Sequence, residues 1–132
     1  MSDTGIVRIR LPEELPEPLS HYTDAVRAGD HIWISGMLGV DATGTLSDAG
    51  VVPQAEQVFR NLRAVLDHEG ASFDDVIKVV IYVLDIRDRA PINTVRRRHF
   101  GPARPASTLI EVSALAVPGA LIEIEAVAYA PR

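Results

Sequence analysis

The chain has 132 residues, a mass of 14.3 kDa and a hydrophobic fraction of 47%. This size and composition predict one packed domain over residues 1–132 and exclude a disordered chain. The absence of cysteine excludes disulfides, thiolate nucleophiles and cysteine metal ligands. The net charge of −5 gives no general attraction to nucleic acid. Neither a secretion signal nor an apolar run of the roughly 20 residues that span a membrane is recognisable, so a cytoplasmic protein is expected.

The first half of the sequence predicts a hairpin. A Pro/Glu-rich arm over Leu11–Pro18 precedes two strand-like runs, Tyr22–Ala28 and His31–Leu38. The turn residues Gly29 and Asp30 separate these runs, which favours an antiparallel pair. A loop rich in Gly, Asp, Thr and Ser follows the second run.

The next segment has the clearest helical pattern. Its apolar residues recur at spacings of three and four and form one face, Ala55, Val58, Phe59, Leu62, Val65 and Leu66. Polar residues fill the opposite face, Gln54, Glu56, Gln57, Arg60 and Arg63. Pro53 suits the first turn and Gly70 the C-terminal end. The apolar stripe indicates a helix that packs on the core.

The second half predicts a strand, a helix and two more strands. Val76–Leu84 is rich in β-branched residues and nearly all apolar, as expected of a central strand. Arg89–Phe100 is expected to be helical, with Asp88 as N-cap and Pro91 in the first turn. Two strands close the chain, Ser107–Val112 and Leu121–Tyr129. This order, which leaves room for one extra N-terminal strand, predicts an α+β fold with two helices on one face of a mixed sheet.

The last strand carries two carboxylates on one face. Alternation places Ile122, Ile124, Ala126 and Ala128 toward the helices, and Leu121, Glu123, Glu125, Val127 and Tyr129 on the other side. The strand before it repeats the pattern, with Ser107, Leu109 and Glu111 on one face. A face so apolar is usually covered by another subunit, which favours an oligomer.

Two interpretations of these carboxylates remain open. Glu123 and Glu125 lie two residues apart, so their Cα atoms are about 6.5–7 Å apart along the strand. Either side chain can be held in an interface salt bridge with arginine, as buried carboxylates usually are. Alternatively, one of them is a partly desolvated general acid or base with a raised pKa.

Other candidate sites are weaker. The histidines lack metal-binding spacing, and neither a Gly-x-Ser-x-Gly elbow nor a glycine-rich phosphate loop is present, so no metal or nucleotide cofactor is indicated. The arginine run Arg96–Arg98 is either a solvated helix face or a site for a small anion. Tyr22 is either a core tyrosine or a hydrogen-bond donor in a pocket.

Several segments together resemble the RidA (YjgF/Rid) family, from about Tyr22 to Arg132. They are HYTDAVRAGDHIWISGMLG, VFRNLRAVLDHEGASFDDVIKV, IYVLDIRDRAPINTVRRRHF, PARPASTLIEVSAL and LIEIEAVAYAPR. The resemblance implies a chorismate-mutase-like fold with a six-stranded sheet, assembled as a homotrimer with pockets between subunits. It also implies hydrolysis of reactive enamines or imines to ammonia and a keto acid, without a metal or organic cofactor.

The resemblance also implies roles for particular residues. Glu123 corresponds to the glutamate that activates water, and Tyr22 to the pocket tyrosine. Further substrate-binding positions are Ser35, Gly36 and Asn93, with backbone groups around Leu109.

One departure from the family pattern concerns the substrate. The family's carboxylate-binding arginine stands four residues before the glutamate that corresponds to Glu111, and here that position is Ser107. A serine cannot replace a bidentate guanidinium, so Arg104 or an arginine of another subunit is expected to supply the anion contact. The sequence therefore predicts a Rid-like hydrolase with an altered small-molecule substrate. The alternative is a non-catalytic trimer that binds a metabolite or a partner protein, while the acidic charge disfavours RNA cleavage.

Overall fold

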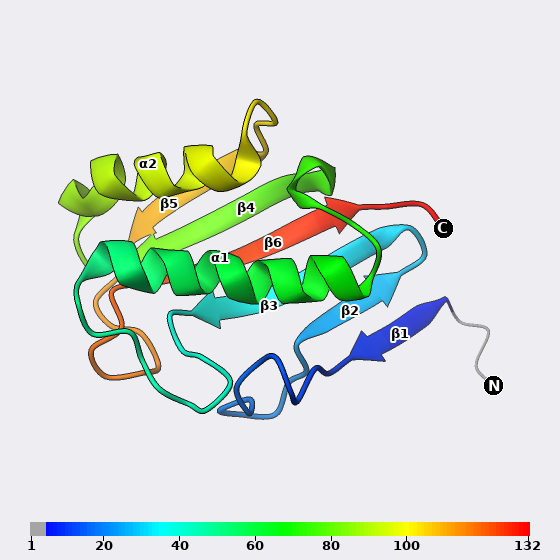
Figure 1. Ribbon diagram of the computed structural model, residues 1–132, viewed down its shortest axis with the longest axis horizontal. Helices are drawn as coiled ribbons and strands as arrows, with labels where there is room; N and C mark the ends of the chain where they lie inside the picture. Colours follow the sequence, from blue (N-terminus) through cyan, green and yellow to red (C-terminus); the bar gives the residue numbers. More distant parts are fainter. Residues whose placement is uncertain (1–4) are drawn as a thin grey trace.

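The fold is one mixed sheet with two helices on one of its faces. A computed structural model describes residues 5–132. Its elements are β1 (Ile6–Ile9), β2 (Ala25–Ala28), β3 (His31–Leu38), α1 (Val51–His68), β4 (Val76–Val83), α2 (Arg89–Phe100), β5 (Ala106–Glu111) and β6 (Ile122–Tyr129). The strand order is β1-β2-β3-β6-β4-β5, with only β4 and β5 parallel in the described sheet. The predicted α+β fold and six-stranded sheet are confirmed (Figure 1).

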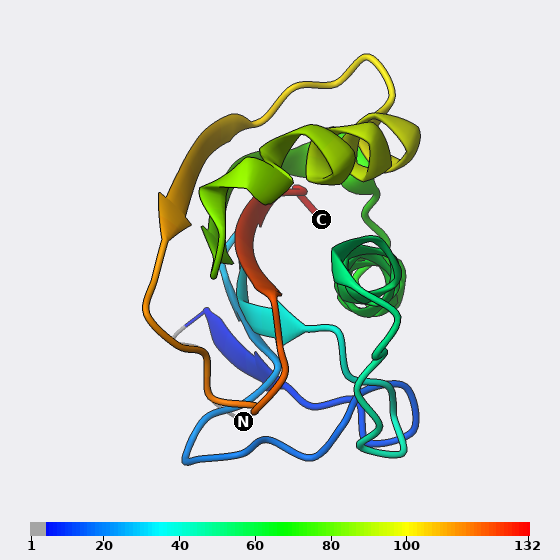
Figure 2. The same ribbon diagram turned by 90° about the vertical axis from the view of Figure 1, so that its left-hand side faces the viewer.

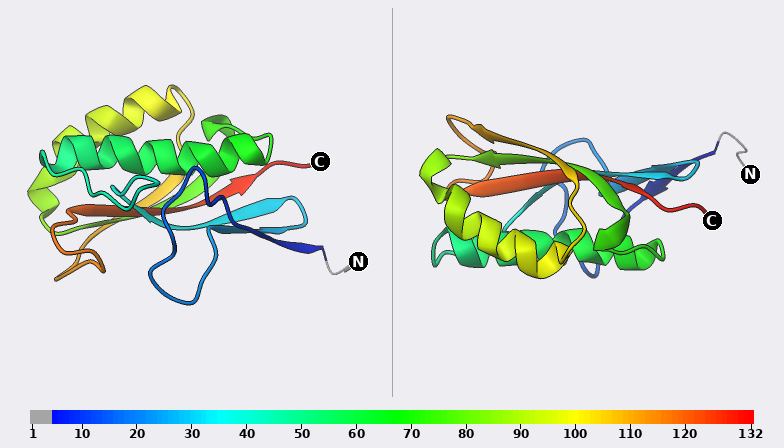
Figure 3. Two further views of the ribbon diagram at one scale, coloured as in Figure 1. Left: turned by 60° about the horizontal axis from the view of Figure 1, so that its bottom comes forward. Right: turned by 90° about the horizontal axis from the view of Figure 1, so that it is seen from above.

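The two helices lie side by side against the sheet and leave its other face open (Figures 2 and 3). β6 lies between β3 and β4 at the centre, and its residues Ile122, Ile124, Ala126 and Ala128 are buried under the helices. The intervening residues are partly or fully exposed on the open face, as alternation predicts. Neither α1 nor α2, the α-helices of the described residues, is long and apolar enough for a transbilayer span.

One strand boundary near the site differs from the prediction. β2 begins at Ala25 instead of Tyr22, and the residue before it, Asp24, bonds both the N-terminal arm and β1. Its Oδ2 accepts from the Leu11 N–H at 2.7 Å, and its own N–H donates to the Ile9 carbonyl at 3.0 Å. The predicted extra strand is β1, which pairs with β2. The irregular arm after β1 therefore folds back over the end of the hairpin.

Helix α1 buries its predicted apolar face and one residue from the predicted polar face. Gln54 is 2% exposed, which corrects its assignment to the solvent side. Its Oε1 accepts from the Leu121 N–H at 2.7 Å, and its Nε2 donates to the Gly119 carbonyl at 3.1 Å. This amide fixes the loop that leads into β6. The reason for its burial is therefore backbone hydrogen bonding, which a hydrophobic pattern does not reveal.

Helix α2 begins differently from the prediction. The chain enters it through a 3-10 turn over Ile86–Asp88, and the capping side chain is Asp85, which accepts from the Arg87 N–H at 2.9 Å. Asp88 has helical backbone angles, so it continues the turn into α2. Asp88 does occupy the predicted N-cap position of α2, but its side chain makes no capping hydrogen bond, and Pro91 lies in the first turn as predicted.

Candidate active site

A β-bulge in the centre of the sheet opens the pairing between β3 and β6. Ile34 pairs with Ala126 and Met37 with Ile124, so Ser35 and Gly36 together oppose Glu125. The bulge is held from the β2 side, where the Ser35 hydroxyl donates to the Thr23 carbonyl at 2.6 Å. The Ser35 N–H also donates to the Asp24 carbonyl at 3.0 Å. The local irregularity is thus fixed by specific bonds.

The side chain of Glu123 lies against this bulge. A Cβ added to Gly36 would be only 1.9 Å from Oε2 of Glu123 and 2.9 Å from its Cδ. No larger residue fits at position 36 unless the carboxylate moves. The Ser-Gly pair predicted as part of the site therefore serves to make room for the carboxylate predicted as its catalyst.

Glu125 is held by a neighbour on β4. Tyr82 pairs with Glu123 across the strands, and its hydroxyl reaches diagonally to donate to Oε1 of Glu125 in a short hydrogen bond. This bond, burial and the charges of Glu125 and Glu123 raise the pKa of Tyr82 to about 12. Tyr82 was not identified from the sequence. The available signal was its alternation with the buried residues Val79, Ile81 and Val83, which places it on the open face beside both carboxylates.

The environment of Glu123 favours its protonated form. Burial raises the pKa of its carboxyl group, and the charge of Glu125 raises it further. Neither glutamate forms an ion pair with a Lys, Arg or His among residues 5–132. A salt bridge within the chain therefore does not account for these two carboxylates. A raised pKa moves this carboxyl group toward the range in which general acid–base catalysis at neutral pH is effective.

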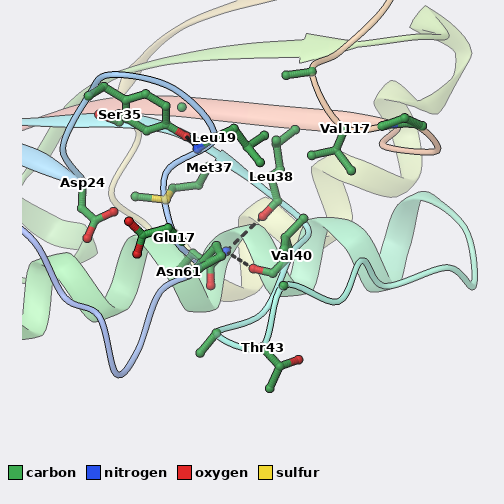
Figure 4. Close-up of a pocket in the computed structure, with 17 residues that line it drawn as sticks. Glu17, Leu19, Asp24, Ser35, Met37, Leu38, Val40, Thr43, Asn61 and Val117 are labelled. Carbon is green, nitrogen blue, oxygen red and sulfur yellow. Dashed lines mark hydrogen bonds between the residues drawn. The ribbon is translucent and has the colours of Figure 1, made fainter.

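Two adjoining cavities meet at the bulge. The smaller, of about 310 Å³, is lined by Glu123, Glu125 and Tyr82, and the larger, of about 510 Å³, by Tyr22 and apolar side chains. Ser35 and Gly36 line both cavities. Figure 4 shows the larger one, enclosed by the N-terminal arm, β3, α1 and the loop before β6. The structure thus places Tyr22 and Glu123 in two neighbouring cavities, and Ser35 and Gly36 form part of the wall of both.

Tyr22 lies at the rim of the larger cavity. Its side chain is 47% exposed, so it is not a core tyrosine. Its hydroxyl oxygen accepts from the Leu19 N–H at 3.3 Å, which leaves the hydroxyl proton available to a second acceptor.

The predicted residues Asn93 and Arg104 lie elsewhere. They line a separate cavity of about 630 Å³ at the C-terminal end of α2, together with Arg96 and Arg97. Burial lowers the pKa of Arg96 there. This cavity shares no lining residue with the two at the bulge, so within one chain it does not join the Glu123 region.

Ser107 and Leu109 also differ from the other candidates in position. They pair with Val79 and Ile81, whose side chains are buried under the helices, and Leu109 packs against that core. Their side chains therefore lie on the opposite face of the sheet from Glu123. On β5 it is Thr108 and Ile110 that share the open face, because they pair with Val80 and Tyr82.

Comparison with known proteins identifies the family. The sequence model of the family described as Endoribonuclease L-PSP matches residues 12–130. A RutC family protein of Pyrococcus horikoshii is 40% identical over 118 residues, which cover 89% of this chain and 93% of that protein. A goat (Capra hircus) protein named 2-iminobutanoate/2-iminopropanoate deaminase is 36% identical over 122 residues, 92% of this chain and 88% of that protein.

A solved structure agrees with these sequence relatives. RidA from the Antarctic bacterium Psychrobacter superposes with a TM-score of 0.87 at 35% identity, over 93% of this chain and 98% of the other. The match thus covers nearly the whole fold. The chain belongs to the RidA (YjgF) family.

Proposed function

We propose that the protein is a hydrolase of small enamines or imines, with Glu123 as its general base and acid. The observation that carries the proposal is the position of the Glu123 carboxylate over Gly36, at the junction of two cavities, with burial raising its pKa. Family relatives named as imine deaminases, such as the goat protein, support the reaction class.

The proposed chemistry needs one carboxyl group and one water molecule. The Glu123 carboxylic acid first gives its proton to the enamine carbon, or to the nitrogen of an imine, which forms an iminium ion and leaves the carboxylate. The carboxylate then removes a proton from water as the water oxygen bonds to the iminium carbon. The carboxylic acid returns that proton to the nitrogen. As the carbon–nitrogen bond breaks, the carboxylate takes the hydroxyl proton, and ammonia and a carbonyl compound leave. Glu123 ends as the acid that it was at the start, so the reaction consumes only water.

Other residues position the reactants in this proposal. Glu125 is immobilised by the Tyr82 hydroxyl, so its charge stays beside Glu123 and stabilises the iminium ion. Tyr22 donates its hydroxyl proton to the substrate from the rim of the larger cavity. The bulge at Ser35 and Gly36 forms the wall shared by the two cavities.

We further propose that the working form is a homotrimer in which a neighbouring subunit covers the open sheet face. Trp33, Ile110 and Tyr129 lie on that face and are 53%, 40% and 45% exposed. The rings of His31 and Tyr129 contact each other edge to face at 5.1 Å between centroids. Large aromatic and aliphatic side chains grouped on an open sheet face are typical of a subunit interface. A covered face would also exclude bulk water from Glu123.

The test compares isosteric carboxyl replacements. Imines are generated continuously by an amino acid or amine oxidase, and ammonia release is measured with and without the protein. Glu123→Gln is expected to abolish the acceleration while the protein remains folded. Glu111→Gln is the matched control, because Glu111 is an exposed strand glutamate whose Oε1 accepts from the Ile86 N–H, a bond that an amide oxygen preserves. Undiminished turnover by Glu123→Gln would contradict the assignment. No acceleration by the wild-type protein, combined with measurable metabolite binding, would instead favour the non-catalytic role.

A further inference from the structure

The cavity at the C-terminal end of α2 is cationic and has no counter-charge of its own. It is lined by Arg96, Arg97 and Arg104, and none of its described lining residues is acidic. None of these three guanidinium groups forms an ion pair within residues 5–132. Arg98, by contrast, is paired with Glu56 on α1 at 2.5 Å. The cavity therefore presents three positive charges that the chain itself leaves unpaired.

Arg96 is the one of these three arginines that the fold partly buries. Arg97 and Arg104 are exposed, whereas burial lowers the pKa of Arg96 and no nearby carboxylate offsets this effect. Asn93 lies one turn earlier on α2, so the side chains of Asn93 and Arg96 extend from the same face of the helix. A guanidinium that loses hydration without gaining a partner is unfavourable unless an anion binds there. Asn93 and Arg96 thus form a wall of the cavity that suits a carboxylate.

The cavity also lies close in sequence to the position of the missing arginine. Pro105 lines it, and Ser107, where the family pattern has its carboxylate-binding arginine, follows two residues later. The side chain of Ser107 is on the sheet face that the helices cover, because Ser107 pairs with the buried Val79. An arginine at position 107 would therefore lie on the same side of the sheet as α2 and on the opposite side from Glu123 (Figure 2). The sheet separates the two within one chain, so they can act on one substrate only across a contact between subunits.

The open sheet face has the opposite unpaired charge. Glu123 and Glu125 line the smaller cavity and have no cationic partner within residues 5–132. In a ring of three identical subunits, one surface of each subunit contacts a different surface of the next. The arginine cavity and the Glu123 face are complementary in charge, which favours their contact in such a ring.

We infer that Arg96 of one subunit binds the carboxylate of a 2-imino acid substrate whose C=N group lies beside Glu123 of the next subunit. Arg96 supplies the guanidinium that is missing at Ser107, and the Asn93 amide donates to the same carboxylate. Two parallel bonds from the planar guanidinium orient the imine carbon toward the water that Glu123 activates. The inference rests on the proposed function and the proposed trimer, and it names the residue that selects the substrate.

The experiment uses two imines that differ only in the carboxylate. An amino acid oxidase converts leucine into its imino acid, and an amine oxidase converts isopentylamine into the imine with the same branched chain but no carboxylate. The imine remaining at timed intervals is trapped with semicarbazide, and its loss with and without the protein gives the acceleration. The variants are Arg96→Gln, Arg96→Lys and Arg104→Gln. Arg89→Gln is the matched control, because Arg89 is an exposed arginine of the same helix that lines none of these three cavities.

Arg96→Gln is expected to lower the acceleration of the leucine imine by about 10- to 100-fold, the effect of losing a charge-assisted bidentate contact. The isopentylamine imine has no carboxylate to lose that contact, so its acceleration should change little. Arg96→Lys retains the charge without the planar fork and should restore part of the acceleration. Arg104→Gln and Arg89→Gln should behave like the wild-type protein with both imines.

Three results would overturn the inference and leave the proposed function standing. The first is an unchanged acceleration of the leucine imine in Arg96→Gln, and the second is a selective loss in Arg104→Gln instead. The third is an equal loss for both imines, or dissociation of the trimer, in Arg96→Gln, since Arg96 would then form a structural ion pair at the interface. Acceleration of neither imine by the folded wild-type protein contradicts the proposed function itself.

Mixed trimers test whether Arg96 and Glu123 of one site come from different subunits. Chains with Glu123→Gln and chains with Arg96→Gln are produced together and purified through two different affinity tags, so that every trimer contains both variants. In a ring, each such trimer has one site at which both residues are intact, and about one third of the wild-type acceleration of the leucine imine is expected. If both residues of a site came from the same chain, no site would be intact. Acceleration that stays at the level of the two parent variants would therefore overturn the two-subunit arrangement.

Discussion

The Glu123 carboxylate occupies the space that a Cβ at Gly36 would need, with 1.9 Å between that Cβ position and Oε2. The clash would involve the far end of a flexible side chain, so it can be relieved by moving Glu123. Gly36→Ala is therefore expected to leave thermal stability nearly unchanged and to lower imine hydrolysis by about 100-fold, the effect of an ångström-scale misplacement of a catalytic group.

Gly39, which follows the last residue of β3, provides the contrasting substitution. A Cβ at position 39 would lie 2.8 Å from Cα of Gln54, so the clash is with the backbone of α1. Gly39→Ala is expected to destabilise the fold by about 1–3 kcal/mol, measured by urea unfolding, with activity per folded molecule retained. If Gly36→Ala lowered stability and Gly39→Ala lowered activity instead, Gly36 would serve packing and not the site.

The raised pKa of Glu123 predicts a characteristic dependence of stability on pH. Its folded-state pKa lies above the unfolded value, so its favourable contribution is complete below the unfolded pKa and is lost as the pH rises through the folded pKa. Glu123→Gln should therefore gain thermal stability relative to the wild-type protein as the pH rises from acid to neutral. Melting temperatures at a series of pH values measure this difference. The control Glu111→Gln should show no comparable trend. If the difference in melting temperature between Glu123→Gln and the wild-type protein did not change with pH, the burial of the Glu123 charge would be contradicted.

Tyr82→Phe removes the hydroxyl that donates to Glu125. A lost hydrogen bond to a charged group should cost about 1–3 kcal/mol of unfolding free energy. Because the folded pKa of Tyr82 is about 12, above the usual 10.0, its contribution is complete below pH 10 and is lost between about pH 10 and 12. Absorbance titration should show one tyrosine ionising near pH 12 in the wild-type protein and none in Tyr82→Phe.

The buried pair of Arg27 and Glu69 should control stability without affecting chemistry. Nε of Arg27 lies 2.6 Å from Oε1 of Glu69, and the two side chains are 3% and 5% exposed. Burial alone would raise the pKa of Glu69, but bonds from Arg27, His68 and Arg132 hold it below its usual value. Glu69→Gln leaves the Arg27 charge buried and should cost about 3–5 kcal/mol. The wild-type advantage should fade as the pH falls through the folded pKa of Glu69, and folded Glu69→Gln should hydrolyse imines normally.

The proposed trimer can be tested at Trp33, whose indole is exposed at the middle of the open sheet face. Trp33→Glu places a charge in the proposed interface and is expected to shift the mass measured by light scattering from three chains of 14.3 kDa toward one. Val52→Glu on α1 is the control. A wild-type protein that is monomeric at micromolar concentration would contradict the trimer directly.

The helices and the sheet could be predicted because their hydrophobic periods agree with the observed burial. The alternation of β6 correctly separated Ile124 from its neighbours Glu123 and Glu125, and the spacing of α1 correctly identified its core face. Gln54 was assigned to the wrong face of α1, because it is buried to bond a distant loop, which residue type alone cannot reveal. Asp88 was placed correctly at the N-cap of α2, but the capping hydrogen bond is made by Asp85 in the preceding 3-10 turn.

The candidate site was only partly accessible from the sequence. Glu123, Tyr22, Ser35 and Gly36 came from the family resemblance, and the structure places them in two cavities that share Ser35 and Gly36. Tyr82 was missed because its relation to Glu125 depends on which strands are neighbours, and β4 and β6 are separated by a helix and a strand in sequence. Cross-strand register is a property of the assembled sheet, so periodicity along one segment cannot supply it.

The extra residue of the bulge is not required for the pairing of the sheet. Before the bulge, the side chains of Ile32 and Ile34 point toward the helices. Two residues, Ser35 and Gly36, then lie opposite one residue of β6. Because of this extra residue, the side chain of Met37 again points toward the helices. Deleting Gly36 would leave Ser35 opposite Glu125 and keep Met37 inward, so an unbroken strand would satisfy the same core. The sheet is thus complete with one residue fewer. Gly36 is the extra residue of this pairing, and its lack of a side chain leaves room for the Glu123 carboxylate.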